Sequence, residues 1–174
     1  MDYDFELKFK LPPDNLDIDE LIERLSEAGC DDALIGSGLP GRIALQFTRE
    51  GESAQQAIVS ALQDVKKVIP TAQLIEVGPD FAGLTDVAEL VGVTRQNIRK
   101  LMLAHAESFP APVHEGSAAL WHLAPVLQWL KSHAGYSIER AVVDVAHVAM
   151  QINLAKEARC LEKPIQREVQ ALVT

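Results

Sequence analysis

The first eighty residues alternate between strand and helix periodicity. From Tyr3 to Leu11 an apolar side chain recurs at every second position, so that all of them lie on one face of a predicted β-strand. The same period of two returns at 43–47. Short apolar runs at 33–35 and 71–77 predict two more strands, and a Gly-Pro pair at 78–79 indicates a hinge.

Two segments between these strands have helical spacing instead. The first runs from about Asp17 to Ala28, with Gly29 as its expected end. The second opens with Ser53 and Gln56, three residues apart as in a capping box, and stops at Pro70. The resulting β-α-β-β-α-β order predicts a ferredoxin-like domain over residues 1–78. Because that fold serves many functions, it indicates none by itself.

The segment from Leu84 to Leu101 has the spacing of two short helices joined by a turn. Small Ala88 suits the point where the helices cross, and Gly92 suits the turn because glycine tolerates positive φ. Thr94 stands where it can cap the second helix. The apolar positions that both helices would share are Val87, Val91, Val93, Ile98 and Leu101. This pattern predicts a helix-turn-helix with its recognition helix at about 94–104.

The solvent face of that second helix is basic and free of acids. Arg95 and Arg99 lie one turn apart, as do Gln96 and Lys100. Arginine pairs with a guanine edge through two hydrogen bonds, and glutamine or asparagine pairs with adenine. We therefore expect Arg95, Gln96 and Asn97 to contact bases, and the later cations to contact the backbone or base edges. The alternative is a merely solvated helix face. The predicted DNA-binding residues are Thr94, Arg95, Gln96, Asn97, Arg99 and Lys100.

Residues 109–130 read FPAPVHEGSAALWHLAPVLQWL. The Phe109–Val113 stretch, the turn at Gly116, the Leu120-Trp121 pair and the closing helix resemble the excisionase and prophage-regulator (AlpA-like) group, which is related to the DNA-binding domain of MerR proteins. The resemblance covers about residues 81–133. It implies a winged helix-turn-helix, in which a β-hairpin wing is followed by a helix that packs on the two DNA-binding helices.

The predicted wing departs from that group because it contains no arginine or lysine. Its weaker candidates for nucleic-acid contact are His114, Ser117 and His122. Histidine is mostly neutral at pH 7, so this wing adds little electrostatic affinity. The two histidines would oppose each other across the hairpin, but without a third ligand they do not predict a metal site. Trp121 and Trp129 are interpreted as core residues.

A long helix is predicted from Ser137 to about Leu161. Its apolar stripe recurs at spacings of four and three, as in a coiled coil, through Ile138, Val142, Val145, Ala149 and Ile152. A small wing domain does not easily cover so wide a stripe, so residues 136–174 are interpreted as a helical dimerisation arm that pairs two DNA-reading heads. The alternative is that the helix folds back on its own chain. After Pro164 a short amphipathic segment completes the arm.

The net charge of −9 is unusual for a DNA-binding protein, so its distribution matters. Residues 1–79 hold 15 acidic and 7 basic residues, whereas residues 80–135 hold 5 and 4. The acidity thus belongs to the N-terminal segment and argues against DNA binding there. No apolar run approaches the length of about 20 residues that a membrane helix needs. Cys30 and Cys160 have no partner at metal-ligand spacing, and reduced thiols in a cytoplasm are expected.

Together these patterns predict an α+β protein with a ferredoxin-like domain (1–78), a winged helix-turn-helix (79–135) and a C-terminal helical arm (136–174). The leading hypothesis is a cytoplasmic, bacterial-type transcriptional regulator that binds double-stranded DNA as a homodimer, with a ligand or protein bound by its acidic domain. The alternative is an antitoxin-like or adaptor module whose main partner is a protein. The sequence contains no nucleophile-base pair, phosphate loop or metal-ligand spacing, so we expect neither an enzyme nor a cofactor.

Overall fold

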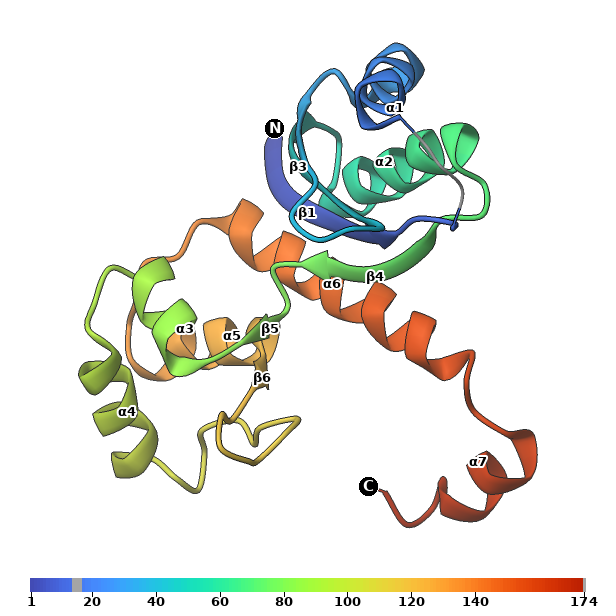
Figure 1. Ribbon diagram of the computed structural model, residues 1–174. Coiled ribbons are helices and arrows are strands. Elements are labelled where there is room, and N and C mark those ends of the chain that lie inside the picture. Colours follow the sequence, from blue (N-terminus) through green and yellow to red (C-terminus); the bar gives the residue numbers. More distant parts are fainter. Residues whose placement is uncertain (14–16, 174) are drawn as a thin grey trace.

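The computed structural model describes residues 1–13 and 17–173. The chain is mixed α/β, with a small antiparallel sheet and seven helices in this described part. It builds an N-terminal body (residues 1–13 and 17–78) and a central body (residues 81–133). A long helix, α6 (Arg140–Ala158), runs between them (Figure 1).

The N-terminal body contains a four-stranded sheet of order β2-β3-β1-β4, in which every neighbouring pair is antiparallel. The bounds of the strands are β1 (Asp2–Lys10), β2 (Ala33–Gly36), β3 (Arg42–Glu50) and β4 (Gln73–Gly78). Phe5 stands opposite Phe47 and Leu7 opposite Leu45, so the alternating apolar residues of both central strands share one buried face. All four predicted strands are present.

The helices of this body pack on that apolar face. Helix α1 (Ile18–Leu25) is capped by Asp17, and a wider helical turn from Ser26 to Cys30 follows it. Gly29 adopts a φ of 108° there, so the regular helix ends earlier than the expected Ala28. Helix α2 (Ala54–Val68) begins as predicted, because the Ser53 hydroxyl accepts a hydrogen bond from the Gln56 amide at 3.1 Å.

The central body has its own core. Its elements are β5 (Phe81–Ala82), α3 (Leu84–Leu90), α4 (Arg95–Ala104), β6 (Trp121–His122) and α5 (Leu123–His133). Phe109, Trp121 and Trp129 meet at its centre, with ring centroids 6.3 Å apart for the first pair and 5.1 Å for Phe109 and Trp129. Both tryptophans are buried, as expected, and each indole N–H donates a hydrogen bond.

Helix α6 belongs to both bodies, and this changes the interpretation of its apolar stripe. Val145 and Ala149 are buried in the core of the sheet body with Ile152 packed beside them, whereas Ile138 and Val142 pack on the central body. The chain itself therefore covers the stripe predicted for dimerisation, which is the alternative in which the helix folds back on its own chain. The helix begins after Glu139 rather than at Ser137, because Gly135, with a φ of 69°, precedes a non-helical segment.

The last helix, α7 (Lys163–Val169), extends away from both bodies (Figure 1). In the described part of the chain no helix combines the length and the apolar character that crossing a lipid bilayer requires.

Candidate nucleic-acid interface

Helices α3 and α4 meet through a tight turn whose residues have the conformations that the sequence predicted. Gly92 has a φ of 72°, and the Val93 amide donates to the carbonyl of Ala88 at 2.9 Å. The Thr94 hydroxyl then accepts a hydrogen bond from the Asn97 amide at 3.2 Å. Val87 and Ile98 are fully buried between the two helices. This core fixes the orientation of α4 on α3.

The opposite face of α4 is exposed. It presents every side chain predicted to contact DNA, namely Thr94, Arg95, Gln96, Asn97, Arg99 and Lys100. Across residues 1–13 and 17–173, none of the three cations in this set forms an ion pair. Helix α4 lies at the edge of the central body, on the side remote from the acidic sheet (Figure 1). Its charges are therefore free to meet a ligand.

The predicted wing is a very short hairpin. A single antiparallel bridge joins His114 to Leu120, and Ser117 lies exposed in the turn between them. Trp121 does not pair across this turn. It pairs with Ala82 in the two-stranded β5-β6 sheet. The strand after the turn is thus held by the segment preceding α3, which ties the hairpin to the start of that helix.

His122 does not oppose His114, and the structure explains why. Its Nδ1 lies 2.7 Å from Oδ1 of Asp80, a fully buried carboxylate at the hinge between the two bodies. The second oxygen of Asp80 accepts a hydrogen bond of 2.8 Å from Nδ2 of Asn153, on α6. In turn, Asn153 bonds both the N–H and the C=O of Val77 at 2.9 Å. A buried polar network therefore joins β4, the hinge, β6 and α6.

Sequence reasoning missed this network because its members are far apart in the chain. The one local signal was a polar residue, Asn153, directly after the apolar stripe of the long helix. No group of three potential metal ligands occurs in the described parts of the chain.

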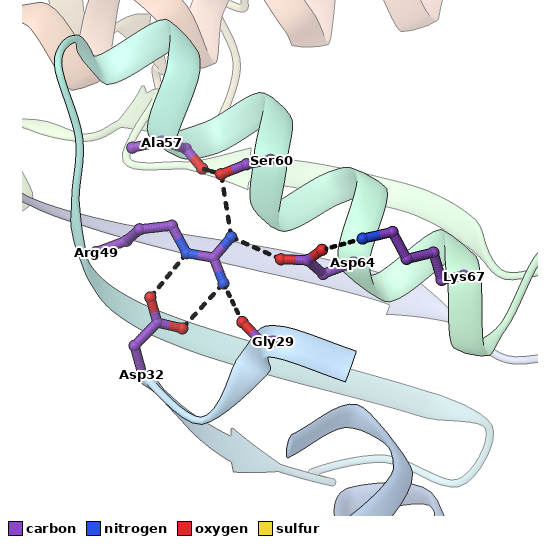
Figure 2. A network of polar contacts seen from close by, with 7 residues as sticks. All are labelled: Gly29, Asp32, Arg49, Ala57, Ser60, Asp64 and Lys67. Atoms are coloured by element: carbon purple, nitrogen blue, oxygen red, sulfur yellow. Dashed lines mark hydrogen bonds and ion pairs between the residues drawn. The ribbon is translucent and has the colours of Figure 1, made fainter. Parts of the chain in front are cut away.

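The N-terminal body contains a second polar cluster, around Arg49 (Figure 2). The guanidinium binds both carboxylate oxygens of Asp32, at 2.7 and 3.0 Å, and one oxygen of Asp64, at 2.9 Å. It also donates to the Ser60 hydroxyl and to the carbonyl of Gly29. Burial lowers the pKa of Arg49, but the bonds and charges of the two aspartates outweigh it, so the net shift is upward. This arginine fastens β3 to α2 and to the turn after α1.

The two cysteines occupy different environments. Burial raises the pKa of the Cys30 thiol to about 11, which keeps it protonated at neutral pH. Cys160 is exposed, and the two are not joined in a disulfide.

Comparisons of the chain with known protein families, with curated proteins and with solved structures found no match.

Proposed function

We propose that the protein is a sequence-specific DNA-binding transcriptional regulator that inserts α4 into the major groove. The observation that carries the proposal is the exposed, acid-free face of α4, on a helix anchored by a buried core and capped by Thr94. A recognition helix needs both properties, since the anchor sets its angle and the free face contacts the bases.

Two features of the fold support the proposal. The strand order β2-β3-β1-β4 with two helices on one face supports the ferredoxin-like arrangement expected for residues 1–78. The α3-turn-α4 unit, the short hairpin at His114 and the β5-β6 strands support a winged helix-turn-helix like that of the excisionase and AlpA-like group. A regulator of this kind works in the cytoplasm. Because one chain offers few cations to the DNA phosphates, a dimer would double the number of phosphate contacts.

In vitro selection from random DNA duplexes tests the proposal. The wild type should enrich a short motif. Its affinity for that motif should fall as the salt concentration rises, because the lysines and arginines of the protein displace counterions from the DNA phosphates when they bind. The Arg95→Ala/Arg99→Ala variant should bind the same duplex at least about tenfold more weakly, since each lost base contact costs about 1–3 kcal/mol.

The matched control is Lys10→Ala/Arg42→Ala, which removes two exposed cations that face each other on β1 and β3. This control should leave DNA affinity unchanged. If wild-type protein enriches nothing, or the α4 variant binds as tightly as the control, then α4 is not a recognition helix.

The second candidate is a protein-interaction module of the antitoxin or adaptor type. The favouring observations are the acidic outer face of the sheet, with Asp4, Glu6 and Glu76, and a wing without lysine or arginine. Failure of the DNA selection together with a stable complex between the full chain and a protein encoded beside it would favour this candidate.

A further inference from the structure

The end of the predicted C-terminal arm, residues 159–173, is amphipathic, and nothing in the described part of the chain covers its apolar side chains. From here on, the arm means these residues. Its apolar side chains range in exposure from 38% at Val169 to 79% at Leu172. They are Leu161, Ile165, Val169, Leu172 and Val173. Within the part of the chain that the structure describes, no residue of α7 is buried. So many exposed apolar side chains on one short segment indicate a contact with another surface.

The cations of the arm lie on the other side of its helix. Lys163 and Arg167 are one turn apart, whereas Ile165 and Val169 project from the opposite face. With Arg159 the arm has three cations against two acids, Glu162 and Glu168. Its excess of positive charge therefore fits a groove that has an apolar floor and an acidic rim.

The chain contains a groove of this kind between its two bodies. A cleft of about 700 Å³ opens between the outer face of the sheet and α3. Its apolar lining includes Phe81 and Leu90, which are 40% and 38% exposed, and Val142. Besides the buried Asp80, its acidic residues come from both walls and are Asp4, Glu6, Glu76, Asp86 and Glu89.

The acids dominate the electrostatics of the cleft wall. Lys8 is a cation in the lining, and Glu6 and Glu76 hold its ammonium at 3.0 and 3.9 Å. Burial lowers the pKa of Lys8, but these two acids raise it more, so the net shift is upward. Such a wall attracts further positive charge.

We propose that the C-terminal arm of one chain docks into the interdomain cleft of a second copy, and that the exchange is reciprocal. The apolar face of α7 lies on Phe81 and Leu90, and its cations reach the acidic rim. A two-fold axis then makes every contact twice. This interface is independent of DNA binding, and it differs from the coiled-coil pairing that the sequence suggested for α6.

The chain length favours a second copy over the arm's own cleft. Val145 lines the cleft and Ala158 ends α6, so the two residues are separated by about 20 Å of helix at 1.5 Å per residue. The link from Arg159 to Glu162 spans at most about 14 Å. To enter its own cleft the arm would have to double back along α6, whereas a neighbouring chain offers its cleft without that turn.

Charge reversal on each side tests the proposal with the full chain. The arm variant is Lys163→Glu/Arg167→Glu and the cleft variant is Glu6→Lys/Glu89→Lys, which changes one acid on each wall. Sedimentation velocity should give twice the 19.0 kDa of the chain for wild type. Each variant alone should dissociate at least about tenfold more readily. The arm variant places negative charge against the acidic rim, and the cleft variant removes the excess of negative charge that attracts the arm.

Mixing the two variants provides the decisive measurement, because both contacts of the mixed dimer then join opposite charges. The mixture should form a dimer, detected by affinity capture of one tagged variant with the other. Lys10→Glu/Arg42→Glu is the control and should dimerise like wild type. A wild type that is monomeric, a cleft variant that dimerises unaided, or a mixture that stays monomeric while circular dichroism shows folded chains would each overturn the proposal.

Discussion

Arg49 of the N-terminal body and Arg95 of the central body occupy opposite environments. Arg49 is buried and bound by two aspartates, a hydroxyl and a backbone carbonyl (Figure 2). Arg95 is exposed, and among residues 1–13 and 17–173 no acid pairs with it. A guanidinium group holds secondary-structure elements together where the fold supplies acceptors for it, as at Arg49. Where the fold supplies no acceptor, as at Arg95, the same group is available to a ligand. If this comparison is correct, substitutions at the two sites will separate stability from binding.

The largest effect is expected at Arg49. Arg49→Met should lower the free energy of unfolding by about 3 kcal/mol, because it leaves Asp32 without its cation and Asp64 with Lys67 alone. Urea denaturation followed by circular dichroism measures the change. The control is Arg42→Met, an exposed position on the same strand, with an expected change below about 0.5 kcal/mol. Equal stability of the two variants would show that the buried cluster does not hold the N-terminal body together.

Asn153 extends the comparison to a polar group without charge. Asn153→Ala removes three hydrogen bonds and leaves Asp80 and the backbone of Val77 buried with fewer partners. We expect a loss of about 2 kcal/mol in the free energy of unfolding. Gln151→Ala, on the exposed face of the same helix, is the matched control. A loss no greater than that of the control would mean that water replaces the amide at little cost.

The sequence predicted the elements whose signals are local. Alternation from Tyr3 to Leu11 located β1, and the Ser53 and Thr94 caps located the starts of two helices. The exposed face of α4 was predictable for the same reason, since helical spacing separates Ile98 from the cations around it.

What covers the apolar stripe of α6 was not predictable in this way. Val145 and Ala149 have the same pattern whether a sheet or a second subunit packs on them, and only the path of the chain decides between the two. Pairing of β5 with β6 was missed because two-residue strands have no period. The partnership of Asp80 with His122 spans 42 positions, and no local pattern connects them.

Thr94 is intermediate between residues that hold the fold together, such as Arg49, and residues that are exposed to a ligand, such as Arg95. Its hydroxyl caps α4, whereas the side chains that follow it are exposed. Thr94→Ala should cost about 1 kcal/mol in the free energy of unfolding, since the Asn97 amide loses its acceptor. Thr94→Ser keeps the hydroxyl and should keep most of the stability. Thermal denaturation of the three proteins compares them. Equal melting temperatures for the serine and alanine variants would show that the cap contributes nothing.

The smallest effect on stability is expected at the exposed arginines. Arg95→Ala/Arg99→Ala should change the free energy of unfolding by no more than about 0.5 kcal/mol, because neither side chain has a partner in the described residues and alanine is a good helix former. Urea denaturation alongside Arg49→Met measures it. A loss above about 1 kcal/mol would place these arginines among the residues that hold the fold together. Weaker DNA binding by that variant would then no longer indicate a direct contact, because a displaced α4 would produce the same result.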